Sequence, residues 1–433
     1  MLLLSSLVIY LPSLVFSQVT GVNVILTAIV SSLVCVFYTT IGGFKTVVWT
    51  DVLQFFVMII AFVAMFCLGM SKINGFDTLW ETSVKGHRLN IFDFSFDPTL
   101  RDSFGSVLIG GGMYWLNVTC VSPVAVQKLL SVPTLKDVKK IIIIYAIGVA
   151  LIHIFVTFTG LLIYTTYSKC DPILTKRVSK FEELVPYFVM DVAGKIQGYP
   201  GIFVAGVFST GLSTLSATLN TMSAVIYEDF LSVFLPKNLS QRRISTILKI
   251  LVLVSGCFST VLVLAFQKVK GIFPVFIGLS AACFGPSLGL FFLGVLLPVS
   301  NSKGAFYGGL SGIAFISYIF IQSQKHPIDN IFLKPFSAEG CNFTSYQNTT
   351  SKEVDLPFFI YRISFWLYTF MGALVTVTVG VIISCFSKHD KNYVSKDLLT
   401  PFIHSLVKEQ LPIDGLTELT QLQTEIKEDK QLN

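Results

Sequence analysis

The sequence predicts an all-α polytopic membrane protein with about ten transmembrane helices. Hydrophobic residues make up 53% of the 433-residue chain and charged residues only 13%, against about 25% charged residues in soluble domains. The mean hydropathy is +0.73. The apolar residues are gathered into runs of about 20, the length that a helix needs to cross the hydrocarbon core.

Ten such runs follow one another along the chain. They are residues 2–18, 20–42, 47–70, 104–127, 139–166, 198–231, 241–266, 271–299, 304–324 and 361–387. The first could be read as a signal peptide, but it lacks a basic leading region and a clear small-residue cleavage site, so we interpret it as a span. We therefore expect a transmembrane domain over residues 1–387 and a polar cytoplasmic tail over 388–433.

Two of the runs contain helix-breaking residues. The run 104–127 carries Gly110, Gly111, Gly112 and Pro123, and the run 271–299 carries Pro274, Gly278, Gly285 and Pro286. Such residues in mid-span free backbone groups that neighbours, water or a ligand must then satisfy. Both spans are expected to be interrupted, and discontinuous helices are typical of transporter substrate sites. For the first, the alternative is a kinked helix with Lys128 reaching toward the membrane surface.

Charge and sequons indicate the orientation. The short loops 128–140 and 232–245 are basic and are expected to be cytoplasmic. The long loops 71–103 and 325–360 are then extracellular, and the second carries the glycosylation sequons of Asn342 and Asn348. Cys170 and Cys341 also fall in polar loops on this side, so a disulfide between them is a hypothesis.

The segment 206–223 carries two rows of polar side chains at helical spacing. One row is Ser209, Ser213, Ser216, Asn220 and Ser223, and the other is Thr210, Thr214, Thr218 and Thr221. Uncharged oxygens suit a weakly held hard cation such as Na+. The alternative is that the hydroxyls bond to their own helix backbone or allow close helix packing.

Two further sets of polar residues lie within the apolar runs. Asp51 is ionisable and falls inside a span, which is a functional hypothesis by default. Its alternative is a carboxylate at a helix start, satisfied by first-turn N–H groups. The broken run carries Trp115, Asn117, Ser122 and Gln127, which we interpret as candidate substrate contacts.

Other classes of function lack support in the sequence. No phosphate-binding loop, zinc-protease motif or nucleophile elbow occurs, so an enzyme is not expected. No dense basic patch indicates nucleic acid. No cofactor is expected beyond Na+ as a coupling ion, and the lipid bilayer is the other partner. The oligomeric state is left open.

Several stretches resemble the sodium/solute symporter family. They are residues 37–54 (FYTTIGGFKTVVWTDVLQ), 88–94, 170–172, 199–205 and 285–290. The resemblance covers most of residues 1–390 and is strongest to the sodium-coupled monocarboxylate transporters, with the multivitamin transporter next. It implies a LeuT-like inverted-repeat fold and Na+-coupled symport of a small organic anion, such as lactate, a short-chain fatty acid or nicotinate, across the plasma membrane.

The resemblance also implies a sodium site. Its ligands would be the Thr210 carbonyl and the hydroxyls of Ser213 and Thr214. A second site in some relatives matches Asp51, Ser213 and Ser216, although the next hydroxyl of that pattern is Ala217 here.

Three departures from the family pattern keep alternatives open. Counted forward, the spans match core helices three to ten plus two peripheral helices, so the chain is expected to be N-terminally truncated, without core helices one and two. The broken run reads SPVAVQK over residues 122–128 where relatives carry Asn-Gln or Asp-Gln before a Val-Gln-Arg, and Pro274 replaces a glutamine. A transport-inactive truncated form and a member with a shifted substrate or channel-like activity are therefore alternatives.

Overall fold

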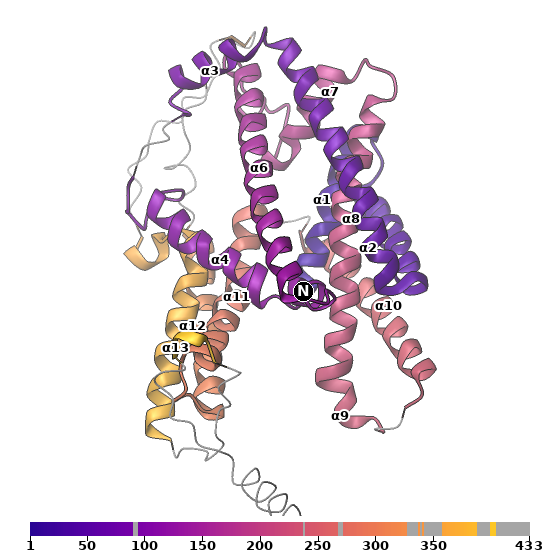
Figure 1. Ribbon diagram of the computed structural model, residues 1–433. Coiled ribbons are helices and arrows are strands. Elements are labelled where there is room, and N and C mark those ends of the chain that lie inside the picture. The colour runs from indigo at the N-terminus through magenta and orange to yellow at the C-terminus, as the bar shows by residue number, and fades with distance from the viewer. Residues whose placement is uncertain are drawn as a thin grey trace, which may run out of the picture. The chain divides into compact units, whose positions relative to one another are not determined.

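A computed structural model gives the fold of the chain. It describes residues 1–89, 94–236, 239–266, 272–326, 337, 340–341, 357–387 and 399–403. Within these residues all regular secondary structure is helical, as the sequence predicts. The chain divides into two compact units, each described here by itself (Figure 1).

The first unit comprises Met1–Phe104, Ser122–Ser280 and Ile328–Phe358. Its main helices are α1 (Leu2–Thr20), α2 (Val24–Lys72), α3 (Phe76–Lys85), α5 (Pro123–Leu130), α6 (Leu135–Tyr167), α7 (Leu184–Ala193), α8 (Tyr199–Ile226) and α10 (Gln241–Phe266). One apolar core joins α1, α2, α8 and α10 around Tyr10, Leu215 and Leu219. A second core joins α2, α6, α7 and α8 around Leu162 and Phe188.

The second unit comprises Gly105–Val121, Ala281–Pro327 and Phe359–Asn433. It contains the π-helical turns η1 (Ser106–Gly111) and η2 (Asn117–Val121), the short α4 (Gly112–Leu116) between them, α12 (Ser302–Lys325) and α13 (Tyr368–Phe386). The helix α11 (Ile272–Leu296) runs from the first unit into the second. The apolar core of the second unit gathers around Ala281, Ile316 and Tyr368.

The helix boundaries follow local signals in the sequence. Gly21 ends α1 with a left-handed φ of 76°, and the side chain of Asn23 starts α2 by accepting from the backbone N–H of Ile25. Gly43 has φ 58° and kinks α2, so this one long helix supplies two of the expected spans. Thr134 caps α6 by accepting from the N–H of Asp137.

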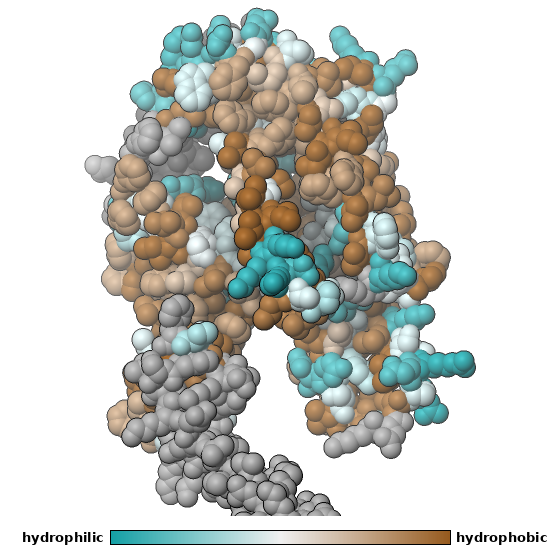
Figure 2. Space-filling model, in the orientation of Figure 1, coloured by the Kyte–Doolittle hydropathy of each residue, from teal (hydrophilic) through white to brown (hydrophobic). Residues whose placement is uncertain are grey.

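The expected number of spans is confirmed by length and composition. In the described part of the chain, nine helices are long and apolar enough to cross a membrane, or ten if Ser106–Val121 and Pro123–Leu130 form one broken span. The apolar residues that these helices expose are suited to lipid, and Figure 2 shows apolar side chains over much of the visible surface. The first run is one of the nine.

Two expectations about helix continuity have different outcomes. The break in the run 104–127 is confirmed, because Ser122 leaves the helical conformation with ψ 126° and Pro123 begins a new helix. The expected interruption of the run 271–299 is wrong, since α11 continues through Pro286. Proline is tolerated inside membrane helices where the freed backbone group is satisfied by its surroundings. Beside it, α11 packs closely on α13, since a Cβ on Gly285 would lie 2.9 Å from the Cα of Gly372.

Candidate functional site

The hydroxyl-rich segment forms the middle of α8, which packs against α1 and α2 (Figure 1). Two glycines bring the helices close. A Cβ on Gly211 would lie 2.7 Å from Cγ of Pro12 in α1, and a Cβ on Gly206 would overlap the side chain of Ala61 in α2. This close approach places the polar side chains of α8 within reach of α2.

Most hydroxyls of α8 bond to their own helix. Thr210 donates to the carbonyl of Gly206 at 3.1 Å, and Thr218 donates to that of Thr214 at 2.7 Å. Ser216, which is fully buried, donates to the carbonyl of Ser213 at 3.1 Å. These three hydroxyls therefore form the bonds to their own helix backbone that the sequence predicts as the alternative to cation binding. Such bonds do not exclude cation binding, because a donating hydroxyl keeps its lone pairs.

Asp51 of α2 makes a side-chain hydrogen bond to α8. Its Oδ1 accepts a hydrogen bond from Oγ of Ser213 at 2.6 Å, and its Oδ2 accepts one from Nζ of Lys128 at 2.9 Å. The Asp51 side chain is 18% exposed and that of Lys128 45%. Both carboxylate oxygens thus engage side chains from other helices, and the helix-start alternative does not describe Asp51.

Lys128 is the residue of this cluster that sequence reasoning missed. The sequence predicts it as a side chain reaching toward the membrane surface and as part of the basic loop 128–140, not as a partner of Asp51. A single cation at the end of one apolar run and a single acid within another are a signal for pairing. The two lie 77 positions apart, however, and their pairing depends on how α5 packs.

The oxygens of Thr210 and Thr214 form a second polar group on α8. Oγ1 of Thr214 donates to the carbonyl oxygen of Thr210 at 3.1 Å. Two oxygens at this separation would subtend ~80° at a hard cation held ~2.4 Å from each, a distance typical of Ca²⁺–oxygen bonds. That angle suits octahedral coordination. These two atoms can therefore belong to one coordination sphere, as the sequence-based assignment requires.

The candidate substrate residues fall in both units. In the second unit, Trp115 is 36% exposed, whereas Asn117 is only 2% exposed and its Nδ2 donates to the carbonyl of Phe284 in α11 at 3.0 Å. In the first unit, Ser122 precedes α5, and Oε1 of Gln127 accepts from Oγ1 of Thr221 at 2.6 Å. Asn117 and Gln127 thus have partners within the protein.

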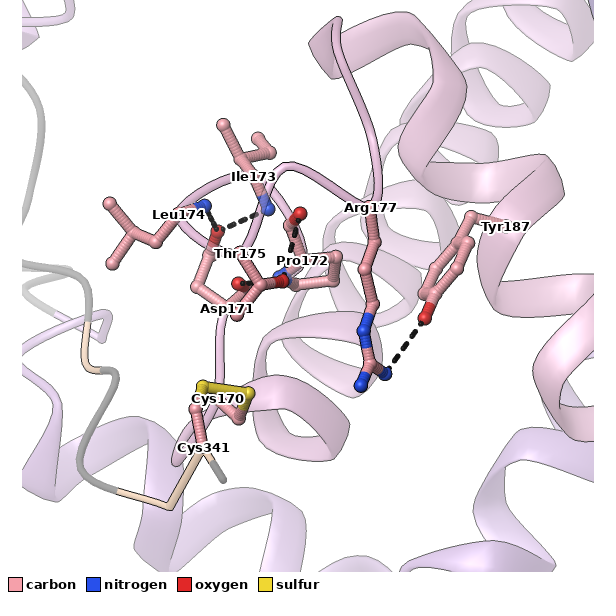
Figure 3. Close-up of a disulfide and its surroundings, with 9 residues drawn as sticks. All are labelled: Cys170, Asp171, Pro172, Ile173, Leu174, Thr175, Arg177, Tyr187 and Cys341. Carbon is pink, nitrogen blue, oxygen red and sulfur yellow. Dashed lines mark hydrogen bonds between the residues drawn. A yellow bond between two sulfur atoms is a disulfide. The ribbon is translucent and has the colours of Figure 1, made fainter. Parts of the chain in front are cut away.

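The two loop cysteines are bonded to each other in the structure (Figure 3). Backbone hydrogen bonds flank the Cys170–Cys341 disulfide, from the N–H of Asp171 to the carbonyl of Ser337 at 3.1 Å and from the N–H of Gly340 to that of Lys169 at 2.9 Å. Nearby, Arg177 donates to the hydroxyl of Tyr187, and this bond raises the pKa of the guanidinium.

The glycosylation candidates Asn342 and Asn348 lie outside the described residues.

Fold and site together define a multi-span helical membrane protein with a carboxylate–hydroxyl cluster between packed helices. The Sodium:solute symporter family matches residues 7–312, and the chain belongs to this family. Its similarity to a solved structure described as a substrate-bound outward-open state of a Na+-coupled sialic acid symporter has a TM-score of 0.68 at 20% identity, over 89% of this chain and 72% of that one. This likeness shows the LeuT-like fold that the resemblance implies.

Relatives in sequence are transporters. Sodium-coupled monocarboxylate transporter 2 of Danio rerio is 34% identical over 94% of this chain and 66% of its own length, and that of Homo sapiens is 33% identical over 92% and 65%. The sodium/iodide cotransporter of Homo sapiens is 30% identical over 89% of this chain and 64% of its own length. The chain thus spans about two thirds of the length of the relatives it matches.

Proposed function

We propose that this chain carries out Na+-coupled symport of a small organic anion, a monocarboxylate such as lactate, a short-chain fatty acid or nicotinate, across the plasma membrane. The observation that carries the proposal is the bond between Ser213 of α8 and Asp51 of α2. It sets a carboxylate and hydroxyls side by side within apolar helices. An ionisable side chain inside a membrane span is energetically costly, and such residues mark ion or substrate pathways. The names of the relatives support the solute class.

In this proposal, Na+ is held by oxygen ligands of α8. The carbonyl of Thr210 and the hydroxyls of Ser213 and Thr214 form the first site, and Asp51 with Ser216 contributes to a second. The transmembrane potential supplies roughly 2.3 kcal/mol per charge per 100 mV to inward movement of Na+. Na+ binding would hold α8 against its neighbours and favour the outward-open state.

The solute is proposed to bind at the broken helix. Trp115, Asn117, Ser122 and Gln127 are its candidate contacts. The N–H groups in the first turn of α5 after Pro123 have no carbonyl partner within their own helix, and such groups attract a carboxylate without requiring an arginine. The basic loops 128–140 and 232–245, and with them the tail, are proposed to face the cytoplasm.

Uptake measurements test the proposed function. This chain, expressed at a cell surface, is expected to accumulate labelled lactate or nicotinate in Na+ medium and not in choline medium. Surface labelling in the same cells controls for expression. Absence of Na+-dependent uptake despite surface expression would contradict the proposal and favour the transport-inactive alternative.

Ser213→Ala tests the cation site. The variant removes the Ser213 hydroxyl, which is a proposed Na+ ligand and which donates to Asp51 in the structure. The Na+ concentration for half-maximal uptake is therefore expected to rise by roughly tenfold.

Ser223→Ala is the matched control, because this buried serine of the same row bonds only its own helix, to the carbonyl of Asn220. Its Na+ requirement should stay that of the unmodified chain. An equal change in the two variants would remove the assignment of Ser213.

A further inference from the structure

Two adjacent residues of α5 bond to two different helices of the first unit. Gln127 accepts from Thr221 of α8 at 2.6 Å, and Lys128 donates to Asp51 of α2 at 2.9 Å. Successive helix residues point about 100° apart, so one turn of α5 reaches both partners. These bonds dock α5 against α2 and α8.

The charge on Asp51 is already balanced. Its two carboxylate oxygens accept from Ser213 and Lys128, and Lys128 brings a full positive charge. A second cation at the same carboxylate would lie close to the ammonium group, and like charges at short range disfavour each other. Cation binding at Asp51 and docking of Lys128 are therefore in competition.

Lys128 also has a route away from Asp51. Its side chain is 45% exposed while that of Asp51 is only 18% exposed. A lysine is a strongly hydrated point charge on a flexible stem. Lys128 begins the basic loop 128–140, so in the proposed orientation the ammonium group can withdraw into water on the cytoplasmic side.

We propose that Lys128 is the resident cation of Asp51 and competes with Na+ for this carboxylate, so that Na+ reaches Asp51 only when α5 is released from α2. The inference rests on the proposed function, which makes Na+ the solution cation. Because α5 begins directly after Ser122 and carries Gln127, Na+ at Asp51 would shift the segment that holds these candidate substrate contacts. Lys128 is in this sense a positioning residue.

Lys128→Gln tests the competition, because glutamine keeps a hydrogen-bond donor and removes the charge. The purified full chain in lipid nanodiscs is heated across a NaCl titration, with choline chloride keeping the total salt constant. Because a positive charge bonded to the carboxylate disfavours a second cation there, its removal is expected to lower the Na+ concentration for half-maximal thermal stabilisation by ~10-fold or more. Binding of ²²Na+ should rise in parallel.

Three further variants make the result specific. Lys128→Arg keeps the charge and should retain the Na+ requirement of the unmodified chain. Lys72→Gln removes a lysine from a different ion pair, in which Nζ of Lys72 lies 2.7 Å from Oδ2 of Asp191 and the two side chains are 40% and 41% exposed. This variant should leave the Na+ requirement unchanged. Asp51→Asn combined with Lys128→Gln should abolish the gain.

Two results would overturn the inference: an unchanged or increased Na+ requirement in Lys128→Gln, or a gain that persists without the Asp51 carboxylate. Its failure is distinguishable from that of the proposed function. Na+-driven uptake by the unmodified chain, together with no effect of Lys128→Gln, contradicts the inference alone. Absence of uptake, together with a gain of Na+ stabilisation in Lys128→Gln, contradicts the proposed function alone.

Discussion

The hydroxyl side chains of α8 form two groups: those that bond the backbone of their own helix and those that bond a side chain of another helix. Thr210, Thr218 and Ser216 bond their own backbone, whereas Ser213 and Thr221 bond side chains of other helices. Bonds of the first kind add nothing between helices. Bonds of the second kind join separate helices, and in membrane proteins each contributes about 0.6–2 kcal/mol.

Asn117 is both a candidate substrate contact and a buried residue that bonds a second helix, and these two roles predict different effects of its replacement. It is buried and bonds the carbonyl of Phe284, so Asn117→Ala is expected to lower the thermal unfolding midpoint. Leaving a buried polar group without its partner costs about 1–3 kcal/mol. Thr119→Val, which removes a hydroxyl bonded to its own helix at Trp115, is the control and should have little effect.

The same pair of variants tests the substrate assignment of Asn117. Thermal unfolding is measured together with the half-saturating solute concentration. A lower midpoint with unchanged solute affinity assigns Asn117 to helix packing. An unchanged midpoint with weaker solute affinity would contradict the packing role and support substrate contact.

At the scale of elements, α12 and α13 pack through small residues repeated every four positions. On α12 these are Gly304, Gly308 and Gly312, and on α13 they are Gly372, Thr376, Gly380 and Ser384. Spacing by four keeps each set on one helix face. Small side chains let the backbones approach closely, which is how helices associate in lipid.

Gly308→Ala is expected to destabilise this helix pair. A Cβ at this position would lie 2.6 Å from the carbonyl oxygen of Thr376, and overpacking of this kind costs about 1–3 kcal/mol. The control is Gly294→Ala in α11, where a Cβ would meet no atom within 4 Å. Fluorescence-detected size-exclusion chromatography after heating compares the two, and equal midpoints would contradict the close-packing argument.

At the scale of the whole molecule, the disulfide connects parts of the chain that are far apart in sequence. Cys170 and Cys341 are separated by 171 positions, and the described residues beside Cys341 also bond the backbone near Cys170. A covalent link over so long a loop restricts the unfolded chain strongly. Disulfides persist in oxidising compartments, and the proposed orientation places both cysteines on the extracellular side.

Cys170→Ser is therefore expected to lower stability by about 2–4 kcal/mol, seen as a lower thermal unfolding midpoint. A reducing agent should lower the midpoint of the unmodified chain to a similar value and leave that of the variant unchanged. Cys257→Ser, which alters an exposed free cysteine in α10, is the control. Alkylation of Cys170 in the unreduced protein would show that the bond is absent.

The sequence predicted the spans better than the details of their packing. Hydropathy and length identified the spans, and Pro123 marked the break before α5. The kink at Gly43, which joins two of the expected spans in one long helix, was not predicted. The reasoning that found the break at Pro123 failed at Pro286, where α11 continues as a helix, because a proline in a membrane helix is tolerated when its surroundings satisfy the freed backbone group.

By itself the sequence determined the membrane class, the family and the rows of candidate oxygens, because hydropathy and helical spacing are local properties of the chain. Only the tertiary structure decided which of these oxygens meet other helices. Ser213 meets Asp51 because Gly206 and Gly211 bring α8 close to its neighbours, and Lys128 meets Asp51 because α5 packs against α8. Partners so far apart in sequence are set by helix packing, which local patterns do not encode.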